Sequence, residues 1–230
     1  MSADLSREHR QRTGGYGADV NGRTLVLGDW TPIVRDGIDV LRLVILGGAV
    51  VYAATGRWGA AALLAVLGGI TLVARLVDLP RLYDLSLTLG MALQGFGETL
   101  GLYDEFVHFD DLVHFTLPML TAPVVYIALA RLDVVPDPRD ETHLQHYVGI
   151  GVVATALGIA IGALWELYEW RSDAWLGTQL SEGNDDTNGD LFRDTLGSLV
   201  GAGLLVVWAR FGWGSVRRIP GVNTHEDVSA

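Results

Sequence analysis

The chain has 230 residues, half of them hydrophobic, and a formal net charge of −11. Its mean hydropathy is +0.31, and the apolar residues fall in long blocks separated by polar breaks, which is typical of a polytopic membrane protein. The acidic balance argues against a nucleic-acid partner. The absence of cysteine excludes disulfides and thiolate metal sites.

The distribution of polar residues divides the chain into three regions. Residues 1–35 are rich in Arg and Gly and lack apolar periodicity, so we interpret them as a cytoplasmic tail. They contain no short apolar segment of a cleaved signal peptide, and the first span is therefore expected to direct membrane insertion. Residues 36–212 are predicted to form one membrane domain, and residues 213–230 a cytoplasmic C-terminal tail.

Six membrane spans are predicted, and the expected fold class is an all-α, polytopic membrane helical bundle. The spans cover residues 37–54, 58–76, 82–102, 111–132, 145–170 and 190–211. The third span contains Asp84, Gln94 and Glu98, so it should face the bundle interior rather than lipid. The fourth is interrupted by Pro118 and Pro123, which membrane helices tolerate as kinks.

Two local features of the first spans also carry expectations. Asp39 and Arg42 are expected to pair at the membrane interface, with the Arg42 side chain snorkelling outward. Gly68 and Gly69, in the middle of the second span, are expected to mark a close contact between helices.

The arginines indicate the orientation in the membrane. Six spans place both termini on one side, and thirteen of the sixteen arginines lie on that side. Only Arg57, Arg171 and Arg193 lie on the other. The positive-inside rule therefore predicts that both termini are cytoplasmic in a plasma (inner) membrane.

Acidic residues and histidines gather at the opposite, outer face. The hairpins that join spans three and four and spans five and six both turn there. The residues predicted to bind a metal are Asp104, His108, Asp111, Glu166, Glu169, Asp190 and Asp194. Facing carboxylate and histidine pairs from different helices resemble the way in which helix bundles hold metal ions. Oxygen-rich ligands with one or two imidazoles suit Mn, Fe, Zn or Mg.

The spacing of these residues places them on shared helix faces. Glu166 and Glu169 are three residues apart, and Asp190 and Asp194 are four apart. Gly197 and Gly201 continue the face of the two aspartates. Such a seam of small residues is expected to bring the aspartates against a neighbouring helix.

Each of these residues also has a purely structural interpretation. Helix capping would account for Asp110 or Asp111 at span four and for Asp186, Thr187 or Asp190 at span six. An ion-pair belt would join Glu166 and Glu169 to Arg171 and Arg193. His108 and His114 would then be interfacial histidines with satisfied hydrogen bonds.

Three motifs occur in order across residues 80–205. They are Y-D-E-F-V-H-F at residues 103–109, A-L-W-E-L-Y-E-W at residues 163–170, and L-G-T-Q followed by D-T-x-x-D-L-x-x-D-x-x-G-x-x-x-G. Together they resemble the signatures of the YjdF-like bacterial inner-membrane proteins. The resemblance implies a shared polar set of Asp104, His108, Glu166, Glu169, Asp190 and Asp194.

The same layout of polar residues is more distantly similar to the VanZ-like membrane proteins. Where that group usually has Gln and Asn, this chain has Glu169 and Asp194. The departure makes the expected site more anionic than a VanZ-like one.

Three functions are consistent with these features. The first hypothesis is a metal-dependent membrane enzyme that acts on a lipid-linked or membrane-interface substrate, with His114 as a general base off the ligand face. The second is a small proton- or cation-coupled transporter in which Gln94 and Glu98 continue the polar path inward. The third is a structural protein whose ion-pair belt supports an interaction with another membrane protein.

Overall fold

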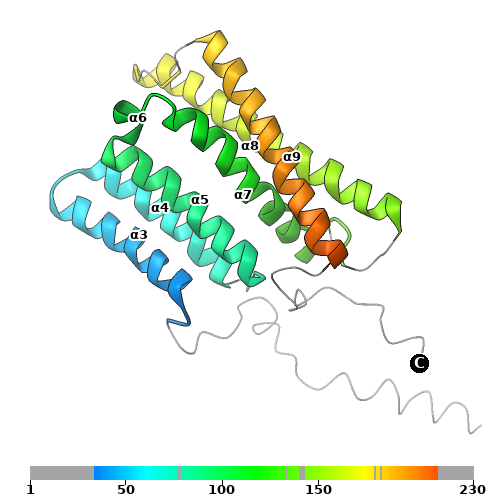
Figure 1. Ribbon diagram of the computed structural model, residues 1–230. Helices are drawn as coiled ribbons and strands as arrows, with labels where there is room; N and C mark the ends of the chain where they lie inside the picture. Colours follow the sequence, from blue (N-terminus) through cyan, green and yellow to red (C-terminus); the bar gives the residue numbers. More distant parts are fainter. Residues whose placement is uncertain are drawn as a thin grey trace, which may run out of the picture.

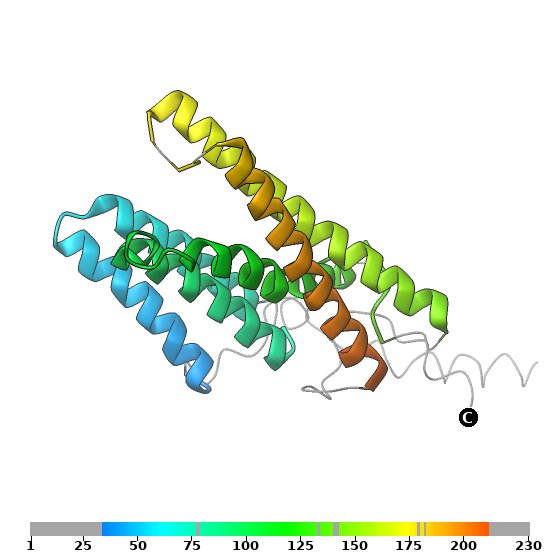
Figure 2. The same cartoon turned by 45° about the horizontal axis from the view of Figure 1, so that its top comes forward.

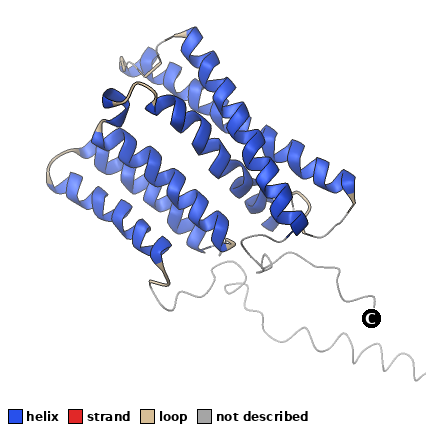
Figure 3. Cartoon of the chain, viewed as in Figure 1, coloured by secondary structure: helices blue, strands red, loops and turns tan. Residues whose placement is uncertain are grey.

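The computed structural model describes residues 34–76, 79–132, 134–139, 143–178, 180–181 and 183–211. Within these residues all regular secondary structure is helical, as the blue ribbons of Figure 3 show. The all-α bundle predicted from the sequence is therefore confirmed. Apart from Val34 and Arg35, the two predicted tails lie outside the described residues.

Six long helices and one short helix make up the described part of the chain. They are α3 (Gly37–Ala54), α4 (Trp58–Leu76), α5 (Arg81–Leu100), α6 (Leu102–Glu105), α7 (Phe109–Arg131), α8 (Leu144–Leu176) and α9 (Asn184–Phe211). The long helices run alternately up and down (Figure 1). We call the end that carries α6 and the α8–α9 connection the outer end. The inner end carries the start of α3 and the end of α9.

Five of the long helices are long and apolar enough to cross a membrane, namely α3, α4, α7, α8 and α9. The remaining one, α5, has 20 residues and packs against α3, α4 and α7. It buries Asp84, Thr88 and Gln94 and exposes Leu85 and Leu89. The expectation that the polar residues of this segment face the bundle interior is confirmed for Asp84 and Gln94, but Glu98, near its outer end, is exposed.

The helices around the outer end differ from the predicted spans. Because α8 continues to Leu176 and α9 begins at Asn184, the polar loop between them is much shorter than predicted. With 33 residues, α8 is roughly 50 Å long at about 1.5 Å per residue, against roughly 30 Å of hydrocarbon. The α8–α9 connection accordingly projects beyond the other helices (Figure 2). In α7, Pro118 and Pro123 lie inside one continuous helix.

Glycines set the closest helix contacts in the α3–α5 half. A Cβ atom built on Gly68 would lie 2.5 Å from the Leu46 side chain of α3, so the expected contact at this position is confirmed. Gly69 has no atom within 4 Å of such a Cβ and faces open space. An apolar core, which includes Tyr83, Ile127 and Trp208, lies between α4, α5, α7, α8 and α9.

Arg42 does not snorkel to the membrane surface. Its side chain is only 2% exposed and pairs with both Asp39 and Asp84, while Arg75 Nε lies 3.3 Å from Asp39 Oδ1. The pairing with Asp39 was predicted correctly, but the outward direction was wrong. Asp84 on α5 supplies a second buried carboxylate. A buried guanidinium paired with two carboxylates costs less free energy than a buried guanidinium without a partner.

Candidate functional site

The small-residue seam of α9 packs closely on α7. A Cβ built on Gly197 would overlap the carbonyl oxygen of Phe115, and one built on Gly201 would overlap that of Met119. Only glycine permits this approach of one helix to the backbone of another. The predicted seam is confirmed, and it brings Asp190 and Asp194 against the first turns of α7.

Glycines of α8 also allow a close approach of α9. A Cβ on Gly162 would overlap the carboxylate of Asp194, and a Cβ on Gly158 would overlap the hydroxyl of Ser198. The carboxylate of Asp194 thus occupies space that a side chain at position 162 would fill. The outer halves of α7, α8 and α9 converge around it.

His114 of α7 lies at the centre of this convergence and is buried. Its Nδ1 atom is 3.2 Å from Asp194 Oδ1. Its Nε2 atom is 3.5 Å from Asp110 Oδ1 and 3.9 Å from Glu166 Oε1. One imidazole therefore contacts carboxylates from three helices.

Glu166 is the least satisfied group of the cluster. Glu166 is 6% exposed, and neither oxygen of its carboxylate has a hydrogen-bond partner among the described residues. The Thr187 side chain of α9 approaches it but does not reach hydrogen-bond geometry. Asp194 Oδ2 is likewise buried without a partner. Buried carboxylate oxygens without donors are costly, so they indicate a missing cation or proton.

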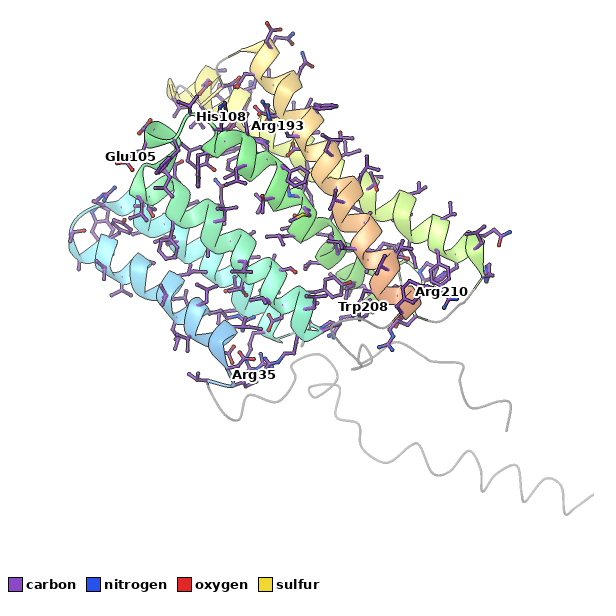
Figure 4. All side chains as sticks on the ribbon, viewed as in Figure 1. Arg35, Glu105, His108, Arg193, Trp208 and Arg210 are labelled. Carbon is purple, nitrogen blue, oxygen red and sulfur yellow. The ribbon has the colours of Figure 1, made fainter. Side chains whose placement is uncertain are left out.

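An arginine connects the buried carboxylates to the surface of the cluster. Arg193 donates from Nη1 to Asp190 Oδ1 at 3.2 Å and lies 2.6 Å from Asp111 Oδ1 through Nη2. Asp111 also contacts His108, whose side chain is 84% exposed. Figure 4 shows His108 and Arg193 close together at the outer end.

The structure brings together some of the predicted metal ligands and separates others. Glu166, Asp190 and Asp194 lie in the buried cluster around His114, and Glu169 lies one turn further out on α8, half-buried. Asp111 lies at its edge. Asp104 and His108 are exposed, and among the described residues His108 pairs with Asp111 rather than with a buried carboxylate.

The orientation of α6 explains the position of Asp104. Tyr103 turns inward, donates its hydroxyl to Gln94 Oε1 at 2.9 Å, and packs edge-on against Phe109. Burial raises the pKa of Tyr103, so it stays a neutral donor. Adjacent residues of a helix point about 100° apart, so a buried Tyr103 leaves Asp104 facing out.

Asp110 is the cluster residue that the ligand prediction omitted. It lies within the first turn of α7, and the N-cap position belongs to His108, whose side chain makes no capping bond. The spacing of four between Asp110 and His114 could have indicated their contact. Capping by Asp190 is also wrong, because α9 begins six residues earlier at Asn184.

The predicted ion-pair belt is not formed as proposed. Arg193 pairs with Asp111 and Asp190 rather than with Glu166. The Arg171 guanidinium stacks on Trp175, 3.2 Å from the ring centroid. The two glutamates therefore lack the arginines that the belt assigned to them.

Two groups of side chains in the cluster lie close enough together that they could hold a metal ion. One group is Asp110, His114 and Asp190, and the other is His114, Glu166 and Asp194. Within each group, one ligand atom from each residue lies within 4.8 Å of the other two. Tetrahedral ligands with bonds of about 2.1 Å lie about 3.4 Å apart. The separations of 3.5 and 3.9 Å around His114 Nε2 are near that value.

Asp194 also determines which nitrogen of His114 is available. With the proton on Nδ1 donated to Asp194, the lone pair of Nε2 points towards Asp110 and Glu166. Histidines that bind metals usually donate their other N–H to a carboxylate in this way. In this arrangement His114 lies on the ligand face, not off it as expected from the sequence.

The sequence model of a family described as "Predicted membrane protein (DUF2238)" matches residues 38–211. This range includes all the described helices except Gly37, and all residues of the cluster. No curated protein and no solved structure matches the chain.

Proposed function

We propose that this chain, a member of the DUF2238 family of predicted membrane proteins, which is the YjdF-like family, is a divalent-metal-dependent enzyme of the membrane surface. The proposed ligands are His114 Nε2, Asp110, Glu166 and Asp190, and Asp194 orients the imidazole. The observation that carries the proposal is the buried Glu166 carboxylate, which has no hydrogen-bond partner among the described residues.

Oxygen ligands with a single imidazole suit Mn, Fe, Zn or Mg. A divalent ion held there would supply Lewis acidity, lowering the pKa of a bound water or polarising an acyl or phosphoryl oxygen. Because His114 becomes a ligand, the role of general base passes to Glu169, which follows Glu166 on the same face of α8.

The charge of the cluster favours an uncharged reacting group. Among the described residues, Arg193 is the cation in contact with the carboxylates, and both of its Nη atoms are already engaged by Asp111 and Asp190. Arg171, another arginine at this end, stacks on Trp175, so a phosphate in the cluster would depend mainly on the ion itself for positive charge. An acyl carbonyl carries no charge to balance, so we assign an acyl rather than a phosphoryl substrate.

The surroundings of the cluster favour a substrate from the lipid–water boundary. Large apolar side chains are exposed around the outer end, including Val107 at 91%, Phe192 at 64% and Trp170 at 60%. Aromatic side chains in such positions are typical of membrane interfaces. A lipid-linked molecule can reach the half-exposed Asp110 from that depth without leaving the membrane.

The proposal places the outer end on the extracytoplasmic side of the plasma membrane. The distribution of arginines supports this orientation. Reporter fusions in the 139–142 loop and at residues 182–186 should report opposite sides. The same side for both would contradict the shared outer face.

The transporter alternative finds less support in the structure. Below the cluster, the apolar core of α7, α8 and α9 includes Val124, Ala154, Ala202 and Leu205. Buried hydroxyls such as Ser198 lie in this region, but no charged side chain of the described residues is buried in this part of the core.

Elemental analysis of detergent-purified protein tests the metal directly. Wild type should carry near-stoichiometric Mn, Fe or Zn, or take up Mg on reconstitution. Glu166→Gln and Asp190→Asn should lose it while remaining folded. Glu105→Gln is the matched control, because Glu105 is an exposed acid at the same end (Figure 4). No metal in wild type after reconstitution with each ion would refute the proposal.

A further inference from the structure

A second feature lies at the inner end, away from the cluster. A groove of about 200 Å³ runs over α7 between α5 and α9. Its lining is almost entirely apolar and includes Tyr83, Ser86, Met119, Pro123, Leu204 and Trp208. Both α5 and α9 pack on α7, so residues of α7 form the floor between them.

The groove opens towards the hydrocarbon of the membrane. Both α7 and α9 are candidate membrane spans, and the side chains at its rim are exposed, Leu204 at 56% and Leu82 at 39%. Exposed leucines of a membrane helix contact lipid chains. Pockets for whole small molecules hold roughly 300–1,000 Å³, so this smaller groove has room for only a segment of one acyl chain, with the rest of the chain in the surrounding lipid.

A basic side chain lies at the inner end of the groove. Arg139, in the connection between α7 and α8, places its guanidinium over the Trp208 ring, 5.4 Å from the centroid. Its Nη1 atom has no hydrogen-bond partner among the described residues. The nearby described acid is Asp137, which accepts the backbone N–H of Arg139 and also interacts through its charge with Arg139, His146 and Arg131.

The walls of the groove contain further donors without acceptors. The Tyr83 hydroxyl and the Trp208 indole N–H are buried and have no partner among the described residues. Their rings pack edge to face with centroids 5.1 Å apart. Neighbouring side chains cover both donors and Arg139 Nη1, but the Arg139 residue as a whole is only half-buried, so other parts of it remain open at the end of the groove.

From these contacts we propose that the groove binds one anionic phospholipid from the leaflet at the inner end. A segment of one acyl chain lies in the groove along α7, and the phosphate pairs with Arg139. The inference does not depend on the metal site, because the two lie at opposite ends of the bundle.

Native mass spectrometry of delipidated protein in detergent tests this site. The protein is incubated with micelles containing either phosphatidylglycerol or phosphatidylcholine. Wild type should retain one phosphatidylglycerol and prefer it about fivefold over phosphatidylcholine, the effect of roughly one interfacial Arg contact. Arg139→Gln should remove this preference. Arg171→Gln, which alters a comparable Arg–Trp pair at the outer end, should leave it unchanged.

A substitution within the groove tests the chain position. Ser86→Phe should fill the groove and weaken retention of both lipids about tenfold, equivalent to roughly two buried methylenes. Gel filtration checks that the Ser86→Phe protein is folded. If Ser86→Phe does not fold, Arg139→Gln remains as an independent test. No retained lipid in wild type would overturn the proposal. An equal preference for phosphatidylglycerol over phosphatidylcholine in wild type and Arg139→Gln would also overturn it.

Discussion

Gly162→Ala tests whether the position of Asp194 controls the candidate metal site. The added methyl would lie 2.5 Å from Asp194 Cγ and 2.9 Å from its Cβ, and it would overlap the carboxylate. Rotation about χ1 would move Cγ and the carboxylate but not Cβ, so the contact with Cβ remains in any rotamer. Asp194 must therefore move away from His114 Nδ1, which it now contacts at 3.2 Å.

The size of the effect follows from the role assigned to Asp194. Loss of a carboxylate that orients a metal-binding histidine typically lowers metal affinity about 10- to 100-fold. Overpacking of a close helix contact costs about 1–3 kcal/mol of stability. Gly162→Ala should show both effects together, a lower affinity and a lower unfolding midpoint.

Two glycine variants separate these effects. Gly68→Ala would overlap the Leu46 side chain of α3, away from the cluster, so it should lower stability but leave metal affinity close to wild type. Gly149→Ala, on the same helix as Gly162, has no atom within 4 Å and should change neither quantity. Affinity is measured by titrating metal-depleted protein, and stability by thermal unfolding in detergent. Wild-type affinity in a folded Gly162→Ala protein would refute the reasoning about Asp194.

Three further predictions concern other parts of the protein. Asp84→Ala should lower the free energy of unfolding by about 3–5 kcal/mol, because Arg42 loses a buried partner; a loss below about 1 kcal/mol in thermal unfolding would contradict this estimate. Burial raises the pKa of Asp137, so stability should fall as pH rises above the unfolded value of about 3.9. Asp137→Asn keeps the acceptor for the Arg139 N–H and should unfold at a higher temperature than wild type at pH 8, with no difference near pH 4; an equal difference at both values would count against it. His108→Ala should leave metal content unchanged, because the side chain is 84% exposed, and loss of metal in elemental analysis would return His108 to the ligand set.

Local patterns in the sequence were sufficient to predict the bundle. Long apolar segments have few alternatives to membrane helices, because an unpaired backbone in hydrocarbon is too costly. The same reasoning located the α9 seam, since glycines at a spacing of four lie on one face. It also indicated that Asp84 and Gln94 of α5 turn inward, since lipid offers them no partner.

The composition of the buried cluster depended on tertiary contacts. Sequence spacing grouped Asp104 and His108 with the buried acids, but the inward turn of Tyr103 leaves Asp104 on the surface. His114 was expected off the ligand face, and it lies at the centre because α8 and α9 both converge on that turn of α7. Spacing along one helix specifies a shared face but not which faces of three helices meet.

The sequence by itself determined the helices, the family and the end of the bundle at which the acidic residues gather, because each depends on periodicity or on motifs within one segment. Tertiary structure alone decided that Asp110 joins His114 and Glu166, that Arg193 binds Asp111 and Asp190, and that a groove opens between α5 and α9. These features depend on the packing of helices that are distant in the chain. That packing is set by close contacts, such as Gly162 against Asp194, whose partners no local pattern identifies.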